Sequence, residues 1–179
     1  MSTPYSLRDL GLSPGQAKSE TVKIDLPPYG QSGVSYVPEP GVEGTLDVNA
    51  MLEGLSFGLR FDANYHGPCA RCLEPAVFHA RTANYELHDA DSTDEEMRSD
   101  FVDDVAQTLD IDAWAQESIG LIFPTRVLCR KDCLGLCQVC GANQNETGVH
   151  EHEKPADTRW EALKALSFDE EPGVDDADA

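Results

Sequence analysis

Four closely spaced pairs of cysteine or histidine residues constrain this chain more than any other feature of its sequence. One pair lies in the first half of the chain, and the other three lie between residues 128 and 152. The pairs are Cys69 and Cys72, Cys129 and Cys133, Cys137 and Cys140, and His150 and His152. Thiolate and imidazole are the donors that zinc takes in tetrahedral sites, and two cysteines three apart can reach one ion from a single tight turn. The eight residues are therefore candidate zinc ligands, enough for two tetrahedral sites.

The last two pairs are expected to close one site locally. A short loop joins the CxxC of Cys137 and Cys140 to the HxH of His150 and His152, and Gly141 suits the turn because glycine tolerates positive φ. This loop is expected to hold one zinc ion. The remaining four cysteines are assigned to a second zinc ion by subtraction, and that site requires the fold to bring distant segments together. Both sites are expected to be structural, because a catalytic zinc keeps one position open for water.

Other interpretations of the cysteines stay open. Cysteines can be small buried hydrophobes or disulfide partners, and CxxC can be a redox motif. The N-terminus shows no basic region followed by an apolar run and a cleavage site, which indicates a cytosolic protein, where disulfides seldom persist. No apolar run approaches 18 residues, so no membrane partner is expected.

The charge of the chain is strongly negative but unevenly distributed. The formal net charge is -20 over 179 residues. Residues 86–117 carry 12 acids and one base, and residues 167–179 carry six acids and no base. The segments that bear the cysteines are close to neutral. Because affinity for phosphates comes largely from Lys and Arg, the net charge disfavours RNA as a partner. The near-neutral segments could still meet RNA, with Arg126, Arg130 and Lys131 touching phosphate, but the field as a whole favours a basic protein.

Hydrophobic periodicity predicts an α+β fold. Alternating apolar residues predict strands at 21–26, 42–51, 55–65 and 76–87, with Cys69 and Cys72 at a hairpin tip. Residues 101–109 are expected to form a last strand or an extended lead-in. A helix is predicted from an N-cap at Asp112 to a stop at Pro124. The expected architecture is an antiparallel sheet that could close like a barrel, with one packed helix and a C-terminal zinc-binding loop followed by a short helix.

Three histidines stand singly in the sequence. His66, His79 and His88 are predicted to be strand residues rather than ligands. Asp157 is predicted to cap the short helix after the zinc loop.

The expected organisation of the chain has four parts. They are a flexible arm at 1–18, an α+β core at 19–127 with an acidic loop at 89–100, a zinc-binding loop and short helix at 128–166, and a disordered acidic tail at 167–179.

Four blocks of the sequence resemble a known family. They are CARCLEP at 69–75, IFP at 122–124, LCRKDCLGLCQVCGANQNE at 128–146 and TRWEALKAL at 158–166. In order and spacing they resemble the YceD family, the large ribosomal RNA subunit accumulation proteins, across residues 20–167. Family members with the full cysteine block usually have GANLN and CxC where this chain has GANQN and HxH. The exchange keeps two zinc donors at the same spacing and excludes a disulfide there.

The resemblance implies a bacterial assembly factor for the accumulation or processing of large-subunit ribosomal RNA. Its partner would be a large-subunit ribosomal protein or precursor ribosomal RNA, with no small-molecule substrate. The sequence shows no Ser/His/Asp order, no phosphate-binding glycine loop and no HExxH helix, so a non-catalytic protein is expected.

Two alternatives remain. The first is a thiol- or zinc-dependent enzyme, for example a nuclease, that uses Cys69 or Cys72 with Arg71 lowering the thiol pKa. The second is a redox or zinc sensor, in which oxidation of Cys137 and Cys140 releases the metal.

Overall fold

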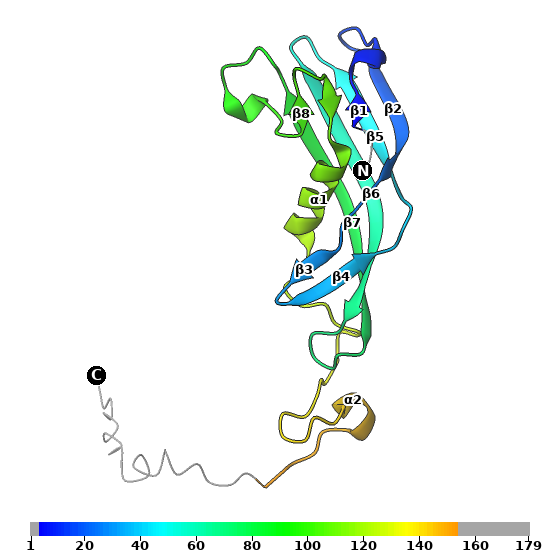
Figure 1. Cartoon of the computed structure of the whole chain (residues 1–179), viewed down its shortest axis with the longest axis vertical. Helices are drawn as coiled ribbons and strands as arrows, with labels where there is room; N and C mark the ends of the chain where they lie inside the picture. The colour runs from blue at the N-terminus through cyan, green and yellow to red at the C-terminus, as the bar shows by residue number, and fades with distance from the viewer. Residues whose placement is uncertain (1–3, 154–179) are drawn as a thin grey trace, which may run out of the picture.

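The fold is built around one long strand, β6. The computed structural model describes residues 4–153. All strand pairs of the main sheet are antiparallel (Figure 1), and β6 pairs with β5 and β4 along one side and with β7 along the other. β2 pairs with β5, and β3 pairs with β4. The strands are β2 (Ala17–Ile24), β3 (Tyr29–Gln31), β4 (Val34–Pro38), β5 (Val42–Ala50), β6 (Leu55–Pro68) and β7 (Pro75–His88).

The sheet is open, so the expectation of a barrel-like sheet is wrong. Within residues 4–153, β2 pairs only with β5 and β7 pairs only with β6, which leaves these two strands at the edges. A barrel buries its apolar face by closing on itself, whereas here a helix covers that face. The closure is therefore not needed to bury the core.

The helix α1 (Ile111–Ile122) covers the apolar face of the sheet and buries Trp114, Ala115 and Ile119. It ends before Pro124 as predicted, but its N-cap is Asp110, whose carboxylate accepts from the Ala113 N–H at 3.0 Å. The predicted cap, Asp112, instead accepts from the Asp25 N–H at 2.8 Å, which ties the start of α1 to the end of β2. On the sheet, the largest fully buried side chains are Leu46, Val48, Phe57, Leu59 and Tyr65.

Phe123, directly after α1, organises an aromatic cluster that the sequence did not predict. Its ring stacks on Tyr29 with centroids 4.1 Å apart and meets Tyr36, Tyr65 and Phe78 edge-on or tilted. Tyr29 and Tyr36 come from the β3–β4 hairpin, which lies between the predicted strands at 21–26 and 42–51. This cluster directs the chain after α1 toward the β6–β7 hairpin.

The N-terminal segment and the segment before α1 pair with each other. β1 (Tyr5–Ser6) and β8 (Val102–Asp103) flank β9 (Thr108–Leu109) in a small second sheet. A short 3₁₀ helix, η1 (Arg8–Leu10), follows β1. Within the described part of the predicted arm, Tyr5 and Ser6 therefore pair with β9, and β2 begins at Ala17. The predicted strand at 101–109 consists of two short strands joined by a turn.

The molecule is elongated, and different segments of the chain lie at its two ends (Figure 1). The acidic loop, which contains the 3₁₀ helix η2 (Glu95–Met97), lies at one end. The β6–β7 hairpin tip and the single helical turn α2 (Gln144–Thr147) lie toward the other end. The helix predicted after Asp157 and the acidic tail at 167–179 lie outside the described residues. No helix in the described range is long and apolar enough to cross a membrane.

Candidate metal centres

The β6–β7 hairpin tip holds the first cysteine pair. The two strands stay paired up to Pro68 and Pro75, and Cys69 closes the tip by donating its N–H to Glu74 O at 2.7 Å. Within the tip, Leu73 takes a positive φ of 64° and its N–H donates to Cys69 O at 3.0 Å. This tight turn brings Cys69 and Cys72 close together, as the spacing predicted.

The second cysteine pair reaches the tip through three hydrogen bonds. Ala70 donates its N–H to the carbonyl of buried Val127 at 2.8 Å. Arg71 donates from Nη1 to Cys133 O at 2.7 Å and accepts from the Leu136 N–H at 3.1 Å. These bonds hold the segment that carries Cys129 and Cys133 against the tip.

The four thiols of this first cluster lie at the distances of a tetrahedral site. The Sγ atoms of Cys69 and Cys133 are 3.8 Å apart, and those of Cys72 and Cys129 are 3.6 Å apart. All four sulfurs lie within 4.8 Å of one another. A zinc ion with four bonds of about 2.3 Å to sulfur places its ligands about 3.8 Å apart. Cys129 is exposed, whereas the other three thiols are buried, and none of the four is in a disulfide.

The pKa values of the four thiols in this cluster differ: two are raised above the ordinary value and two are lowered below it. Desolvation raises the pKa of Cys72 and of Cys129, although the Cys129 residue as a whole is exposed, and the neighbouring thiols raise the pKa of Cys129 further. Burial also acts to raise the pKa of Cys69, but backbone N–H donors outweigh it and lower the pKa to about 6. The Asn145 amide is the largest cause of the lowered pKa of Cys133. Because thiolates this close repel one another, full ionisation of the set requires a cation among them.

The second cluster lies in the loop that follows. The Cys137 Sγ is 3.3 Å from His152 Nε2, and the Cys140 Sγ is 3.2 Å from His150 Nε2. All four donor atoms lie within 4.8 Å of one another. A tetrahedral zinc with sulfur and imidazole ligands separates them by about 3.6 Å. The donor types and distances of both clusters therefore fit zinc.

Local hydrogen bonds shape the second cluster. Gly141 donates its N–H to Cys137 O at 2.9 Å and takes a φ of 73°, the conformation for which a glycine was expected here. The His150 ring places Nδ1 3.2 Å from Gly148 O. Nδ1 therefore carries the proton and donates it to this carbonyl, which leaves the Nε2 lone pair free to bind a metal.

Asn145, in α2, links the two clusters, and sequence reasoning missed it. Its Nδ2 donates to Cys133 Sγ at 3.4 Å, while its Oδ1 accepts from the Leu134 N–H at 2.8 Å and from Arg130 Nη2 at 2.7 Å. The neighbouring Gln144 N–H donates to Gly135 O at 2.9 Å. The loop of the second cluster is thus bonded to a ligand of the first. The only sequence signal for Asn145 was its place in the GANQN block.

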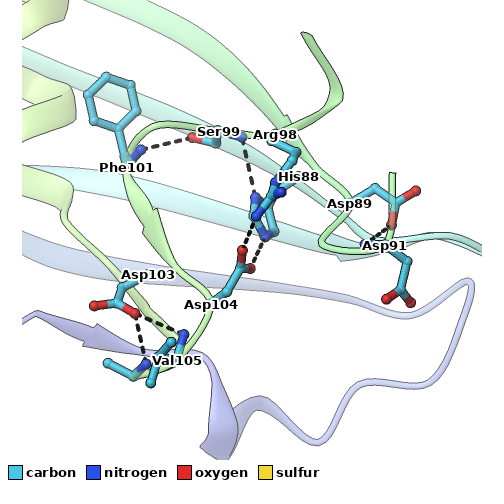
Figure 2. A network of polar contacts seen from close by, with 10 residues as sticks. His88, Asp89, Asp91, Arg98, Ser99, Phe101, Asp103, Asp104 and Val105 are labelled. Atoms are coloured by element: carbon cyan, nitrogen blue, oxygen red, sulfur yellow. Dashed lines mark hydrogen bonds and ion pairs between the residues drawn. The ribbon is translucent and has the colours of Figure 1, made fainter. Parts of the chain in front are cut away.

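A buried histidine at the opposite end, His88, is the last residue of β7 and so a strand residue as predicted, but its hydrogen-bond network was not predicted. His88 accepts from the Ser99 N–H at Nδ1, 3.3 Å away, so its Nε2 carries the proton and donates to Asp104 Oδ1 at 2.8 Å (Figure 2). Arg98 also donates to Asp104, and the hydrogen bonds from His88 and Arg98 lower the pKa of Asp104. This network anchors the acidic loop to the end of β7. His88 stands alone among acidic residues in the sequence, so no local signal revealed this network.

The fold and the clusters together define a class of protein: an open antiparallel sheet with one covering helix and, within residues 4–153, two closed sets of cysteine and histidine donors at one end. The chain belongs to the YceD family. The family description "Large ribosomal RNA subunit accumulation protein YceD" matches residues 57–167, which confirms the resemblance seen in the sequence.

Mycobacterial proteins are among the relatives of this chain. Uncharacterized proteins of Mycobacterium bovis and Mycobacterium tuberculosis are 34% identical over 125 residues, which cover 66% of this chain and 60% of each relative. An uncharacterized protein of Mycobacterium leprae is 26% identical over 180 residues, covering 97% of this chain and 82% of the relative. The chain therefore spans about 60% of the length of the first of these relatives. No solved structure matches the chain.

Proposed function

We propose that this protein is a non-catalytic assembly factor for the large ribosomal subunit, which holds a basic ribosomal protein on a surface stabilised by zinc. The observation that carries this proposal is the match of residues 57–167 to the family of large ribosomal RNA subunit accumulation proteins. A tagged chain in cells that are making ribosomes is expected to retain large-subunit protein or RNA above background. Capture at background level would contradict the proposal.

Zinc is proposed to act as a structural clamp at the hairpin end. The first cluster would be held by Cys69, Cys72, Cys129 and Cys133, and the second by Cys137, Cys140, His150 and His152. Each set saturates a tetrahedral ion, and the ion would crosslink the hairpin tip to the loop that follows α1. Elemental analysis of the intact protein is expected to find two zinc ions per chain, falling to one in Cys72→Ser and to one in His150→Ala.

The distribution of charge supports a protein partner over RNA. The acidic segment 86–117 lies around α1 and at the end of the sheet remote from the clusters (Figure 1). At the cluster end, Arg126, Arg130 and Lys131 are exposed, and Arg130 is paired with Asp132 at 3.5 Å, so few bases there are available to bind phosphates. Binding to a basic ribosomal protein alone is expected to weaken as salt rises, whereas RNA alone is expected to bind weakly at all salt concentrations. Stronger binding to RNA than to the protein would reverse the assignment.

The burial of the first cluster supports a role without catalysis. Cys69 is 0% exposed and Cys72 is 4% exposed, so neither thiol faces a substrate. A nucleophilic cysteine needs both a lowered pKa and access. In the zinc-loaded protein, neither thiol is expected to react with an alkylating reagent. Reaction of either one at the rate of a free thiol would favour the enzyme alternative.

A sensor role is the second candidate, and the exposure of Cys140 favours it. This thiol is exposed and lies in a small loop, so oxidants reach it more readily than the buried thiols of the first cluster. Mild peroxide that releases zinc from the second cluster, with a parallel loss of partner binding, would support this role. Unchanged partner binding after the release would exclude it.

A further inference from the structure

The strand β7 leaves one of its edges unpaired. Among residues 4–153 it pairs only with β6, in an unbroken register from His88 to Pro75. Natural proteins shield such edges with proline, bulges, charge or a covering segment, because the free N–H and C=O groups bind other strands. After its first residue, β7 contains no proline, and Val77, Tyr85 and Leu87 on it are exposed. The structure thus presents a long strand edge that is able to pair with a further strand.

A hollow of about 200 Å³ lies beside this edge, between β7 and α1. Glu86 from β7 and Glu117 from α1 line it together with Phe101, Trp114 and Leu121. Burial raises the pKa of Glu86, and the nearby carboxylates of Glu117 and Asp100 raise it further. Two carboxylates beside aromatic rings are suited to the ammonium of lysine or the guanidinium of arginine.

The acidic loop extends this negative surface beyond the end of β7. The hydrogen bonds of His88 to Ser99 and Asp104 hold the loop against the last residue of the strand (Figure 2). A segment that lies along β7 would therefore have Glu86 and Glu117 near the His88 end of the strand and the loop carboxylates directly beyond them. Backbone hydrogen bonds would supply affinity, and these carboxylates would select for positive charge.

We propose that β7 binds an extended, lysine- or arginine-rich segment of a partner protein as an added strand, with one basic side chain in the hollow between Glu86 and Glu117. This inference rests on the proposed function, because it specifies how a basic ribosomal protein is held. A second copy of the chain is a poor occupant, since each copy carries a net charge of -20 and would bring the same carboxylates together. RNA lacks a peptide backbone to pair with β7, and its phosphates would be repelled.

The test uses the full-length, zinc-loaded protein and a labelled ten-residue peptide of alternating lysine and threonine. A peptide of alternating glutamate and threonine is the control ligand. The lysine peptide is expected to bind and to slow amide hydrogen exchange over residues 76–87. The double variant Glu86→Gln with Glu117→Gln is expected to weaken its binding about tenfold or more, because both carboxylates contact the cation. The control variant Asp9→Asn with Glu43→Gln removes the same charge from exposed positions that do not line the hollow and is expected to change the affinity less than about twofold.

Three results would overturn the inference: an equal loss of affinity in both double variants, no added protection over residues 76–87, or a dimer that protects these residues without peptide. The peptide assay contains no ribosomal component. A chain that binds the peptide as expected but captures no ribosomal material therefore contradicts only the proposed function. A Glu86→Gln, Glu117→Gln variant that captures ribosomal protein as well as the natural chain contradicts only the inference.

Discussion

The two donor clusters use similar chemistry but differ in how the chain assembles them. The first joins thiols that are 57 to 64 residues apart in the sequence, and three of its four thiols are buried. The second joins donors only 10 to 15 residues apart, in a loop where only Cys137 is buried. The first cluster is therefore part of the tertiary structure, whereas the second is a local loop attached to it through Asn145.

The difference in sequence separation has an energetic consequence. Closing a loop of 57 residues removes more freedom from the unfolded chain than closing one of 10 residues. With a cost that grows as the logarithm of loop length, the difference is about 1.5 kcal/mol. The first cluster is also the more buried of the two, so the packing of its thiols increases this difference in stabilising free energy. We therefore expect metal at the first cluster to contribute more to folding stability than metal at the second.

Replacing one buried ligand tests this expectation most strongly. Cys133→Ser removes a thiol that is 0% exposed and would leave the other three thiols without the proposed ion. The free energy of unfolding is expected to fall by about 4 kcal/mol or more, the range for loss of a structural metal. Cys140→Ser, at the exposed cluster, is expected to cost about 1 kcal/mol. Urea denaturation of the zinc-loaded proteins measures both, and equal losses would remove the distinction between the clusters.

Stepwise removal of metal is expected to separate the clusters in time. Cobalt can replace zinc as a spectroscopic probe, because its absorption differs between four-sulfur and two-sulfur, two-nitrogen sites. A chelator should remove the ion of the second cluster about tenfold faster, since local opening of an exposed loop is easier than opening the core. The mixed-ligand spectrum should therefore disappear first. Simultaneous loss of both spectra would indicate one cooperative unit.

Asn145→Ala tests the connection between the clusters. The variant loses the hydrogen bonds to Cys133 and to Leu134, so the loop of the second cluster is no longer held to the first. Metal affinity is expected to fall by about 10- to 100-fold, as for other groups that orient metal ligands. Competition with a chromophoric chelator measures the affinities. Gln138→Ala, at an exposed position in the same loop, is the control and is expected to leave them unchanged.

Exchange of both histidines for cysteine should have the smallest effect. His150→Cys with His152→Cys supplies the CxC that the YceD resemblance associates with these positions. Two zinc ions per chain are expected to remain, with a change in unfolding free energy below about 1 kcal/mol, because the number and spacing of donors are kept. The cobalt spectrum of the second cluster should become that of a four-sulfur site. Loss of one ion would show that the loop requires imidazole.

Features with a local sequence signal were predicted well. Alternation predicted the strands β5, β6 and β7, and the helical repeat of Ile111, Trp114 and Ile119 predicted α1. The structure also brings the eight donors together in the two sets that spacing and subtraction suggested. Binding of zinc by these residues stays a prediction.

The missed features depend on contacts between distant segments. The β3–β4 hairpin packs Tyr29 on Phe123, and the N-terminal strand pairs Tyr5 with Leu109. A short segment of this kind shows little hydrophobic periodicity, because one aromatic side chain or one pair of residues holds it in place. The N-cap was predicted at Asp112 but lies at Asp110 for a similar reason. The Asp112 carboxylate accepts a hydrogen bond from the residue that follows β2.

The donors, their close spacing and the periods of the main strands and helix can be seen in the amino-acid sequence alone, because they depend on residues a few positions apart. Folding brings Cys133 to Cys69 and Asn145 to Cys133, and among residues 4–153 it leaves one edge of β7 unpaired. The physical reason is that strand register and the hydrogen bonds of Ala70 and Arg71 position segments that the chain separates by about 60 residues. No local sequence pattern predicts that these two distant segments come together.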